Sequence, residues 1–452
     1  MAIAIVLILL VVGTLLFHFL SPWWFTPIAS NWQMMDETVN VTFWVTGIVF
    51  VAVNLFLAYA VIRYRHRKGS GQKAHYEPEN KKLEWWLTIV TSVGIAAMLA
   101  PGLSVWAKFV TVPDEATPVE VVGQQWNWSY RLPGKDANLG KVDTRFVNID
   151  NPFGIDPKDP AGQDDVLIAS PELHIPLDKP VKMLLRSKDV NHQFAVPQFR
   201  VKMDMVPGMV TYFWFTPTRT GEFDALCEQL CGMAHFAMRG RVVVDQQAAF
   251  DEWLAAQPTY AQTQAETTGD VQAGQALFGT CSACHGTQAE GNRQLNAPKL
   301  SGQGKWYLVK QLQDFRKGIR GTHDNDVYGK QMAPFAATLA DEAAIRNVVA
   351  YITSLEEVRP QSTVLGNPER GKTLYATCTS CHGAQGQGVW ATNAPRLSNM
   401  SDWYLQRQMH NFREGIRGKH PQDFRGSQMA SMARVLADEQ AISDVIDYVH
   451  TL

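Results

Sequence analysis

Three long apolar stretches in the first quarter of the chain predict membrane-spanning helices. They cover residues 2–20, 41–62 and 85–107, and each is long enough to cross a hydrocarbon core of about 30 Å. The third stretch tolerates Pro101 and Gly102 because they lie near its end. Tryptophans stand at the ends of the spans, where an interfacial aromatic belt is expected: Trp23, Trp24, Trp85, Trp86 and Trp106.

The charges of the two loops predict the orientation of this anchor. Residues 21–40 contain no Lys or Arg, whereas residues 63–82 contain seven. The positive-inside rule therefore places the second loop in the cytoplasm, and everything after about residue 108 outside it. The first span can alternatively be a cleaved signal peptide, although it lacks a basic leading region and a clear A-x-A site. The soluble part faces outward in both cases.

After the anchor, the hydrophobic pattern changes to short alternating runs typical of β-strands. Between about residues 117 and 245 these runs include Val119–Val122, Val181–Leu185 and Val210–Phe215, with Pro and Gly between them. Several short strands at this spacing predict a sandwich or barrel. Residues 246–258 predict a short amphipathic helix, and the Thr-, Gln- and Ala-rich segment that follows predicts a flexible tether.

Composition and cysteine spacing narrow the chemistry. At 452 residues about three domains are expected, and the net charge of −2 gives no bulk electrostatic attraction to nucleic acid. The six cysteines form three close pairs, which favours metal or haem attachment over a disulfide framework.

The first cysteine pair stands in a set of soft metal ligands. Cys227, Cys231, His235 and Met238 lie within twelve residues, and His192 lies 35 residues upstream. Sulfur ligands combined with imidazoles suit copper, and two thiolates four residues apart can bridge two copper ions. The alternatives are a structural zinc site or a disulfide, but zinc would need neither Met238 nor His192.

With this ligand set, residues 40–245 resemble subunit II of cytochrome c oxidases, whose cupredoxin domain holds the dinuclear copper centre CuA. The resemblance implies that Cys227 and Cys231 bridge the coppers, that His192 and His235 each bind one, and that Met238 and the backbone carbonyl of Gln229 are axial ligands. The family usually carries Glu at the position of Gln229, where its side chain helps to hold a magnesium ion. Gln229 keeps the carbonyl but lacks the charge, so the resemblance implies copper binding and leaves magnesium open.

Two further stretches resemble functional parts of the same family. In Gly123-Gln-Gln-Trp-Asn-Trp-Ser-Tyr130, Trp126 occupies the position through which electrons reach CuA, although core packing is an equally good explanation of these aromatic residues. In Lys82-Leu-Glu-Trp-Trp86, Glu84 corresponds to an acid at the mouth of the catalytic subunit's proton channel. An acid at a membrane boundary can also simply be solvated.

The other two cysteine pairs form C-x-x-C-H motifs, Cys281-Ser-Ala-Cys284-His285 and Cys378-Thr-Ser-Cys381-His382. In such motifs the cysteines form thioethers to haem and the histidine is the proximal iron ligand. The motifs lie in an ungapped internal repeat with an offset of 97 residues. Matching pairs include Gly274/Gly371, Trp306-Tyr-Leu308/Trp403-Tyr-Leu405, Gly318-Ile-Arg-Gly321/Gly415-Ile-Arg-Gly418 and Gln331-Met-Ala333/Gln428-Met-Ala430.

Each repeat resembles a class I cytochrome c, especially the dihaem periplasmic cytochromes. The resemblance implies a distal Met ligand in the loop before the last helix, and the repeat selects Met332 and Met429. Met432 is a competitor in the second copy, and His323 and His420 offer a bis-His alternative. Met/His ligation raises the reduction potential, as a donor to an oxidase requires.

Taken together, these patterns predict a multi-domain chain with a transmembrane helical anchor, a β-sandwich cupredoxin-like copper domain and two all-α class I cytochrome c domains. The expected boundaries are 1–110 for the anchor, 111–256 for the copper domain, 257–268 for a linker, 269–355 for the first haem domain, 356–365 for a second linker and 366–452 for the second haem domain. We expect the two haem domains to pack on each other and to move as a unit relative to the copper domain.

The predicted function is that of the subunit through which electrons enter a haem–copper oxidase of the bacterial inner membrane, with the copper and haem domains in the periplasm. Its cofactors are two copper ions as CuA and two covalent haems c. Its partners are the catalytic subunit I, subunit III, and a donor such as a cytochrome c or a quinol-oxidising complex. The alternatives are the copper subunit of a nitric oxide reductase and a membrane-tethered multihaem electron carrier.

Overall fold

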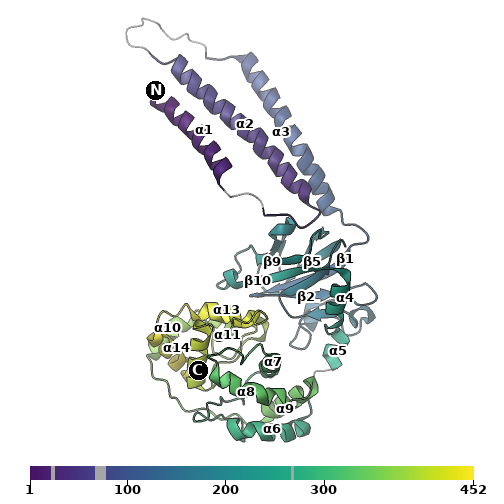
Figure 1. The fold of residues 1–452 in the computed structure, drawn as a ribbon, viewed down its shortest axis with the longest axis vertical. Coiled ribbons are helices and arrows are strands. Elements are labelled where there is room, and N and C mark those ends of the chain that lie inside the picture. Colours follow the sequence, from purple (N-terminus) through teal and green to yellow (C-terminus); the bar gives the residue numbers. More distant parts are fainter. Residues whose placement is uncertain (22–25, 67–77, 266–268) are drawn as a thin grey trace.

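The computed structural model describes residues 1–21, 26–66, 78–265 and 269–452 of the chain. A helical anchor, a β-domain and a helical region follow one another along the long axis of the molecule (Figure 1). The predicted fold class, in which anchor, sandwich and cytochrome domains are separate, is confirmed.

Three helices of the anchor are long and apolar enough to cross a membrane: α1 (Ala2–Leu20), α2 (Gln33–Arg63) and α3 (Lys81–Val110). The second and third exceed the predicted spans because polar turns continue the helices beyond the apolar stretch. The side chain of Asn80, for example, caps α3 by accepting a hydrogen bond from the backbone N–H of Leu83 (3.1 Å). The predicted belt and loop residues Trp23, Trp24, Arg67, Lys68 and Lys73 lie outside the described residues.

The outer ends of these helices are tied to the β-domain. The buried Trp32 donates its indole N–H to the carbonyl of Trp214 (2.9 Å), and Trp214 donates to the carbonyl of Lys108 at the end of α3 (3.1 Å). The guanidinium of Arg200 forms two hydrogen bonds to the carboxylate of Asp36 (2.7 and 2.8 Å). Because Arg63 at the end of α2 and Lys81 and Lys82 at the start of α3 lie at the opposite ends of these helices, this arrangement agrees with the predicted orientation.

Ten strands form two five-stranded sheets, in the orders β3-β2-β1-β5-β8 and β4-β10-β9-β6-β7. The strands are β1 (Thr117–Gln124), β2 (Asn127–Leu132), β3 (Val166–Ile168), β4 (Glu172–Pro176), β5 (Val181–Ser187), β6 (His192–Val196), β7 (Val201–Met205), β8 (Val210–Phe215), β9 (Gly221–Cys227) and β10 (Arg239–Asp245). Aromatic side chains fill the space between the sheets, and Trp128 meets Phe194 edge to face with ring centroids 5.0 Å apart. The core therefore lies directly beneath His192, at the start of β6.

The segment after the sandwich differs from the predicted flexible tether. Helices α4 (Gln247–Ala255) and α5 (Tyr260–Ala265) follow β10, and Tyr260 is 1% exposed. Its backbone N–H donates to the carbonyl of Asp165 (2.8 Å), and the N–H of Ala261 donates to that of Gln163 (2.9 Å). The prediction was wrong for residues 257–265 because the burial of Tyr260 attaches this segment to the copper domain; residues 266–268 lie outside the described residues.

The helical region contains two copies of one fold. The helices of the first copy are α6 (Val271–His285), α7 (Lys305–Arg316), α8 (Val327–Ala337) and α9 (Glu342–Ser354); those of the second are α10 (Pro368–Tyr375), α11 (Thr379–His382), α12 (Asp402–Arg413), α13 (Phe424–Ala433) and α14 (Glu439–Thr451). In each copy the first and last helices cross at a glycine, where a Cβ atom would overlap a backbone carbonyl: Gly274 against Asn347 and Gly371 against Asp444. This close crossing explains the glycine that the repeat retains.

Two local predictions for these domains need correction. Met332 and Met429 lie inside the short helices α8 and α13, not in a loop. These helices form because Asp326 and Asp423 cap their N-termini by accepting hydrogen bonds from the N–H groups of Gly329 and Gly426 (both 3.0 Å). In the second copy, the helix that leads to C-x-x-C-H is also divided into α10 and α11.

Candidate metal and haem sites

The six predicted copper donors meet at one end of the sandwich. The Sγ atoms of Cys227 and Cys231 are 3.7 Å apart. The Sγ of Cys227 lies 3.9 Å from His192 Nδ1 and 3.3 Å from the carbonyl oxygen of Gln229. The Sγ of Cys231 lies 3.4 Å from His235 Nδ1 and 3.7 Å from Met238 Sδ.

Strand pairing explains why donors distant in sequence come together. Strand β9 ends at Cys227, which pairs with Phe194 of β6, two residues after His192. The loop from 228 to 238 then supplies the other four donors before β10 begins.

The spacing of the two sulfurs fits metal binding. It is much longer than a disulfide bond of about 2.05 Å. With metal–thiolate bonds of about 2.3 Å, two sulfurs on one ion at a tetrahedral angle lie about 3.8 Å apart. The thiol hydrogen bond from Cys231 lowers the pKa of Cys227 to about 3, while the same contact raises the pKa of Cys231. A metal ion bound by both sulfurs would hold both as thiolates, because thiolates are the form of cysteine that binds metals.

A carboxylate behind the site orients one of its imidazoles. Asp189 Oδ1 lies 2.8 Å from Nε2 of the fully buried His192, so Nδ1 is left facing Cys227. The sequence analysis did not select Asp189. The sequence feature that could have pointed to Asp189 is its position three residues before the candidate ligand His192.

The surroundings of Gln229 offer little to a magnesium ion. The side chain of Gln229 is exposed, and neighbouring Glu228 pairs instead with Lys202 (3.2 Å). Glu228 therefore does not replace the charge that Gln229 lacks.

Trp126 touches the copper loop directly. It is 4% exposed, and its indole N–H donates to the carbonyl oxygen of Cys231 (3.1 Å). The side chain of Gln125 donates to the same oxygen (2.8 Å). Trp126 is thus packed in the core cluster and in contact with a candidate copper ligand.

The two C-x-x-C-H motifs each line a large cavity. The cavities contain about 1470 and 1620 Å³ of space, including their openings, in the first and second copies. His285 and His382 are buried, which lowers the pKa of each, and their Nδ1 atoms lie 2.7 and 2.8 Å from the carbonyls of Pro298 and Pro395. This hydrogen bond leaves Nε2 of each neutral imidazole free to bind iron.

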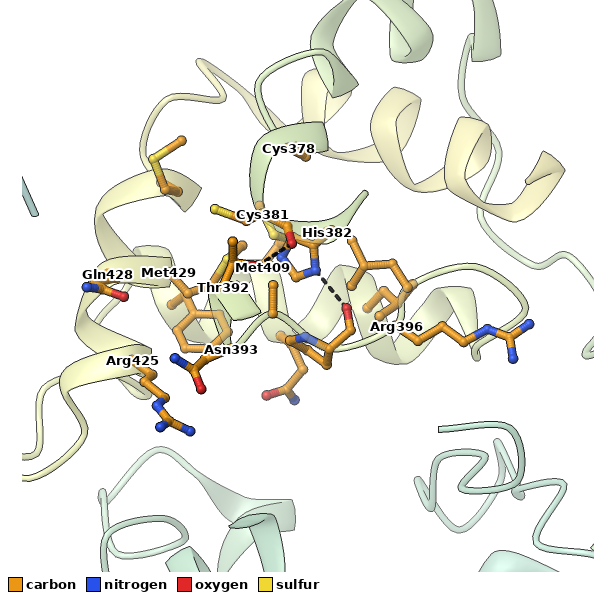
Figure 2. A pocket seen from close by; sticks show the side chains of 18 of the residues that line it. Cys378, Cys381, His382, Thr392, Asn393, Arg396, Met409, Arg425, Gln428 and Met429 are labelled. Carbon is orange, nitrogen blue, oxygen red and sulfur yellow. Dashed lines mark hydrogen bonds between the residues drawn. The ribbon is translucent and has the colours of Figure 1, made fainter. Parts of the chain in front are cut away.

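Candidate distal ligands lie in the same cavities. Met332 lines the first, and both Met429 and Met432 line the second, together with Met409 (Figure 2). His323 and His420 line neither cavity; each accepts a local backbone hydrogen bond (3.2 Å) within its own turn. The geometry therefore favours methionine over a bis-His arrangement.

Two half-buried arginines join the haem domains, and their role was not predicted from the sequence. Arg320 donates to the hydroxyl of Tyr404 (2.8 Å) and to Gln311 (2.6 Å), while Arg417 donates to the hydroxyl of Tyr307 (3.1 Å) and to Gln311 (2.8 Å). Among the described residues neither forms an ion pair, and the Nε of Arg320 has no partner. Half-buried guanidinium groups that line the two cavities fit the carboxylates of a haem. The sequence feature that could have pointed to these two arginines is the repeated Gly-Ile-Arg-Gly motif, which contains them.

The second haem domain, not the first, contacts the copper site. Trp126 and Ala234 line its cavity, and Cys381 and Met432 pack against the core of the copper domain. Gln428, which Figure 2 shows beside Met429, donates to the carbonyl of Trp126 and to that of Ala237 (3.4 Å). The sequence alone could not show which of the two haem domains lies next to the copper site.

At the other end of the molecule, Glu84 lies in the first turn of α3 and is exposed. It is distant from the copper and haem sites, as its predicted place at the cytoplasmic membrane boundary requires.

Comparison with known proteins gives three consistent findings. Residues 117–246 match the family described as cytochrome c oxidase subunit II, periplasmic domain, and residues 271–356 and 368–452 match cytochrome c. The chain is 59% identical over 261 residues to the alternative cytochrome c oxidase subunit 2 of Bradyrhizobium diazoefficiens, covering 58% of this chain and 94% of that protein. It is 31% identical to cytochrome c oxidase subunit 2 of Cereibacter sphaeroides (51% and 77% covered) and 33% identical to cytochrome c4 of Azotobacter vinelandii (41% and 92% covered).

These matches fix the role and the classes of cofactor. The cytochrome c domains imply haem c, and the subunit II domain implies a copper centre. The protein is membrane-anchored with a periplasmic domain, associates with the catalytic subunit, and is the part of a haem–copper oxidase through which electrons enter. The chain belongs to the family of cytochrome c oxidase subunit II and carries two cytochrome c domains in addition.

Proposed function

We propose that electrons pass from an external donor to the first haem domain, then to the second, and through Trp126 to the copper domain and the catalytic subunit. One observation carries this order: Trp126 lines the cavity of the second haem domain and also donates a hydrogen bond to Cys231. The side chain that meets the copper loop is therefore covered by the second haem domain, and an external donor has no direct access to it.

The ligand assignment follows the donors found together. Two copper ions would be held by the thiolates of Cys227 and Cys231, the imidazoles of His192 and His235, the thioether of Met238 and the backbone carbonyl of Gln229. When bound, the dinuclear centre supplies a one-electron relay, and the haems supply two more. Magnesium is not part of the proposal, since Gln229 is uncharged and Glu228 is paired with Lys202.

The proposed haem ligands occupy equivalent positions in the two repeats. Cys281 and Cys284 would attach one haem, and His285 and Met332 would bind its iron. Cys378 and Cys381 would attach the other, and His382 and Met429 would bind its iron. Arg320 and Arg417, whose hydrogen bonds to Tyr404 and Tyr307 join the two domains, would bind haem carboxylates.

The first haem domain is the better place for the donor to bind. Phe335 and Leu295 line its cavity and are 45% and 50% exposed. The repeat counterpart of Phe335 is Met432, which packs against the copper domain. The donor that we propose is a cytochrome c or a quinol-oxidising complex.

The remaining assignments concern the membrane. The protein resides in the bacterial inner membrane with several spans, and its copper and haem domains lie in the periplasm. The catalytic partner is subunit I, together with subunit III. Glu84 lies at the mouth of the proton channel of subunit I.

Matched axial-ligand variants test the proposed order. Met/His ligation raises the reduction potential, so Met429→His would lower that of the second haem domain. We expect rapid mixing with the donor to show normal reduction of the first haem domain but slow reduction of copper. Met332→His should instead slow the first step. Reduction of copper at the wild-type rate in Met429→His would contradict the order.

A further inference from the structure

The contact between the second haem domain and the copper domain contains few side-chain hydrogen bonds. Gln124 donates to the carbonyl of Ala391, and the ammonium of Lys188 lies 5.8 Å from the centre of the Trp390 ring. The third contact is that of Gln428, whose side-chain nitrogen is shared between the carbonyls of Trp126 and Ala237.

Both acceptors of Gln428 belong to the copper site. Trp126 contacts the carbonyl of Cys231 through its indole N–H. Ala237 lies in the 3₁₀ turn His235–Ala237, between the candidate ligands His235 and Met238. The amide group of Gln428 therefore contacts both the residue that packs on the copper loop, Trp126, and a residue within that loop, Ala237.

The other neighbour of Gln428 is the candidate haem ligand Met429, the next residue in α13. A displacement of α13 from the copper loop would move Met429 and its cavity away from Trp126 at the same time. Electron tunnelling falls steeply with distance, so a small displacement at this point would slow transfer between the domains.

We propose that Gln428 is a positioning residue for electron transfer, because its amide holds α13 against Trp126 and the copper loop. This inference rests on the proposed order of electron flow. The first copy supports the specificity of the role: its counterpart Gln331 occupies the same repeat position on α8 and is exposed, and its side chain forms no hydrogen bond within the part of the chain that the structure describes.

The test compares Gln428→Glu with Gln331→Glu in the full-length protein. Glutamate keeps the shape of the side chain but replaces the donor by a carboxylate facing two carbonyl oxygens. The loss of one hydrogen bond should raise the opening equilibrium of the contact about fivefold. We therefore expect hydrogen exchange in peptides covering 124–128 and 234–238 to accelerate about fivefold or more in Gln428→Glu. Gln331→Glu should leave exchange in these peptides unchanged.

Transfer kinetics provide the second readout. After rapid reduction of the haem domains, electron transfer from the second haem domain to copper should slow severalfold in both Gln428→Glu and Gln428→Met, and the reduction potentials of both sites should stay unchanged in the uncharged Gln428→Met. Gln428→Met keeps the volume and helix propensity of the side chain but has no hydrogen-bond donor. It should also slow electron transfer to copper, and it serves as the test if the charge of Glu disturbs folding.

The outcomes separate this inference from the proposed order. Wild-type exchange and wild-type transfer in both Gln428 variants would overturn the role of Gln428 and leave the order intact. If wild-type protein itself shows no transfer from the second haem domain to copper, the proposed order fails and the positioning role fails with it.

Discussion

Replacing Asp189 by Asn tests how strongly the copper site depends on the group behind His192. The carboxylate receives three hydrogen bonds: His192 Nε2 and the backbone N–H of Val190 contact Oδ1 (2.8 and 2.7 Å), and the N–H of Gln125 contacts Oδ2 (2.6 Å). Burial raises the pKa of Asp189, but these hydrogen bonds outweigh it, so the pKa lies below its ordinary value and the group is ionised near neutral pH.

The magnitude follows from the bonds that Asn cannot keep. The side chain has the same shape but only one acceptor oxygen, so an amide NH₂ must face the N–H of Gln125 or that of His192. A hydrogen bond to a charged group contributes about 1.5–3 kcal/mol. Because the side chain of Asp189 is 30% exposed, we take a value near the lower end, about 2 kcal/mol. This corresponds to copper binding about 30-fold weaker, within the range known for groups that orient metal ligands.

Competition of the full-length protein with a copper chelator measures this change. Asp204→Asn is the matched control, because Asp204 accepts a hydrogen bond from the side chain of Gln193 (2.7 Å) and touches no candidate copper ligand. We expect the control to bind copper as the wild type does. Equal affinities for Asp189→Asn and the wild type would show that Asp189 does not orient His192.

Two further predictions concern other parts of the chain. Arg417→Met removes a half-buried positive charge beside the haem cavities, so the reduction potentials should fall by on the order of 50 mV in a redox titration; unchanged potentials would argue against haem carboxylates at this position. Burial lowers the pKa of His174, but hydrogen bonds to Glu172 and Asp245 outweigh it and raise the pKa. The stabilisation is therefore complete below the unfolded pKa of about 6.5 and lost as pH rises through the higher folded value. In thermal unfolding, the copper domain should lose stability over that pH range in the wild type and not in His174→Gln. Parallel pH profiles of stability in both proteins would contradict the stabilising role of protonated His174.

The sequence predicted most of the local chemistry because ligand type and spacing are local properties. Cys227, Cys231, His235 and Met238 stand within twelve residues, and both C-x-x-C-H motifs are visible in the sequence without structural information. His192 required only the pairing of β6 with β9 to reach the same site.

Relations between domains were beyond the sequence. The first haem domain is nearer to the copper domain along the chain, yet the second contacts it, because packing of surfaces and not sequence separation decides which domains meet. The tether prediction failed for a similar reason: a polar composition gave no sign that Tyr260 would be buried against the copper domain.

Metal and haem analysis of the purified full-length chain tests the central claim most directly. We predict two copper ions and two covalently bound haems per chain, with the near-infrared absorption and mixed-valence copper EPR signal of a dinuclear centre. A single metal ion per chain, or zinc in place of copper without these signals, would contradict the assignment of Cys227 and Cys231 as bridging ligands.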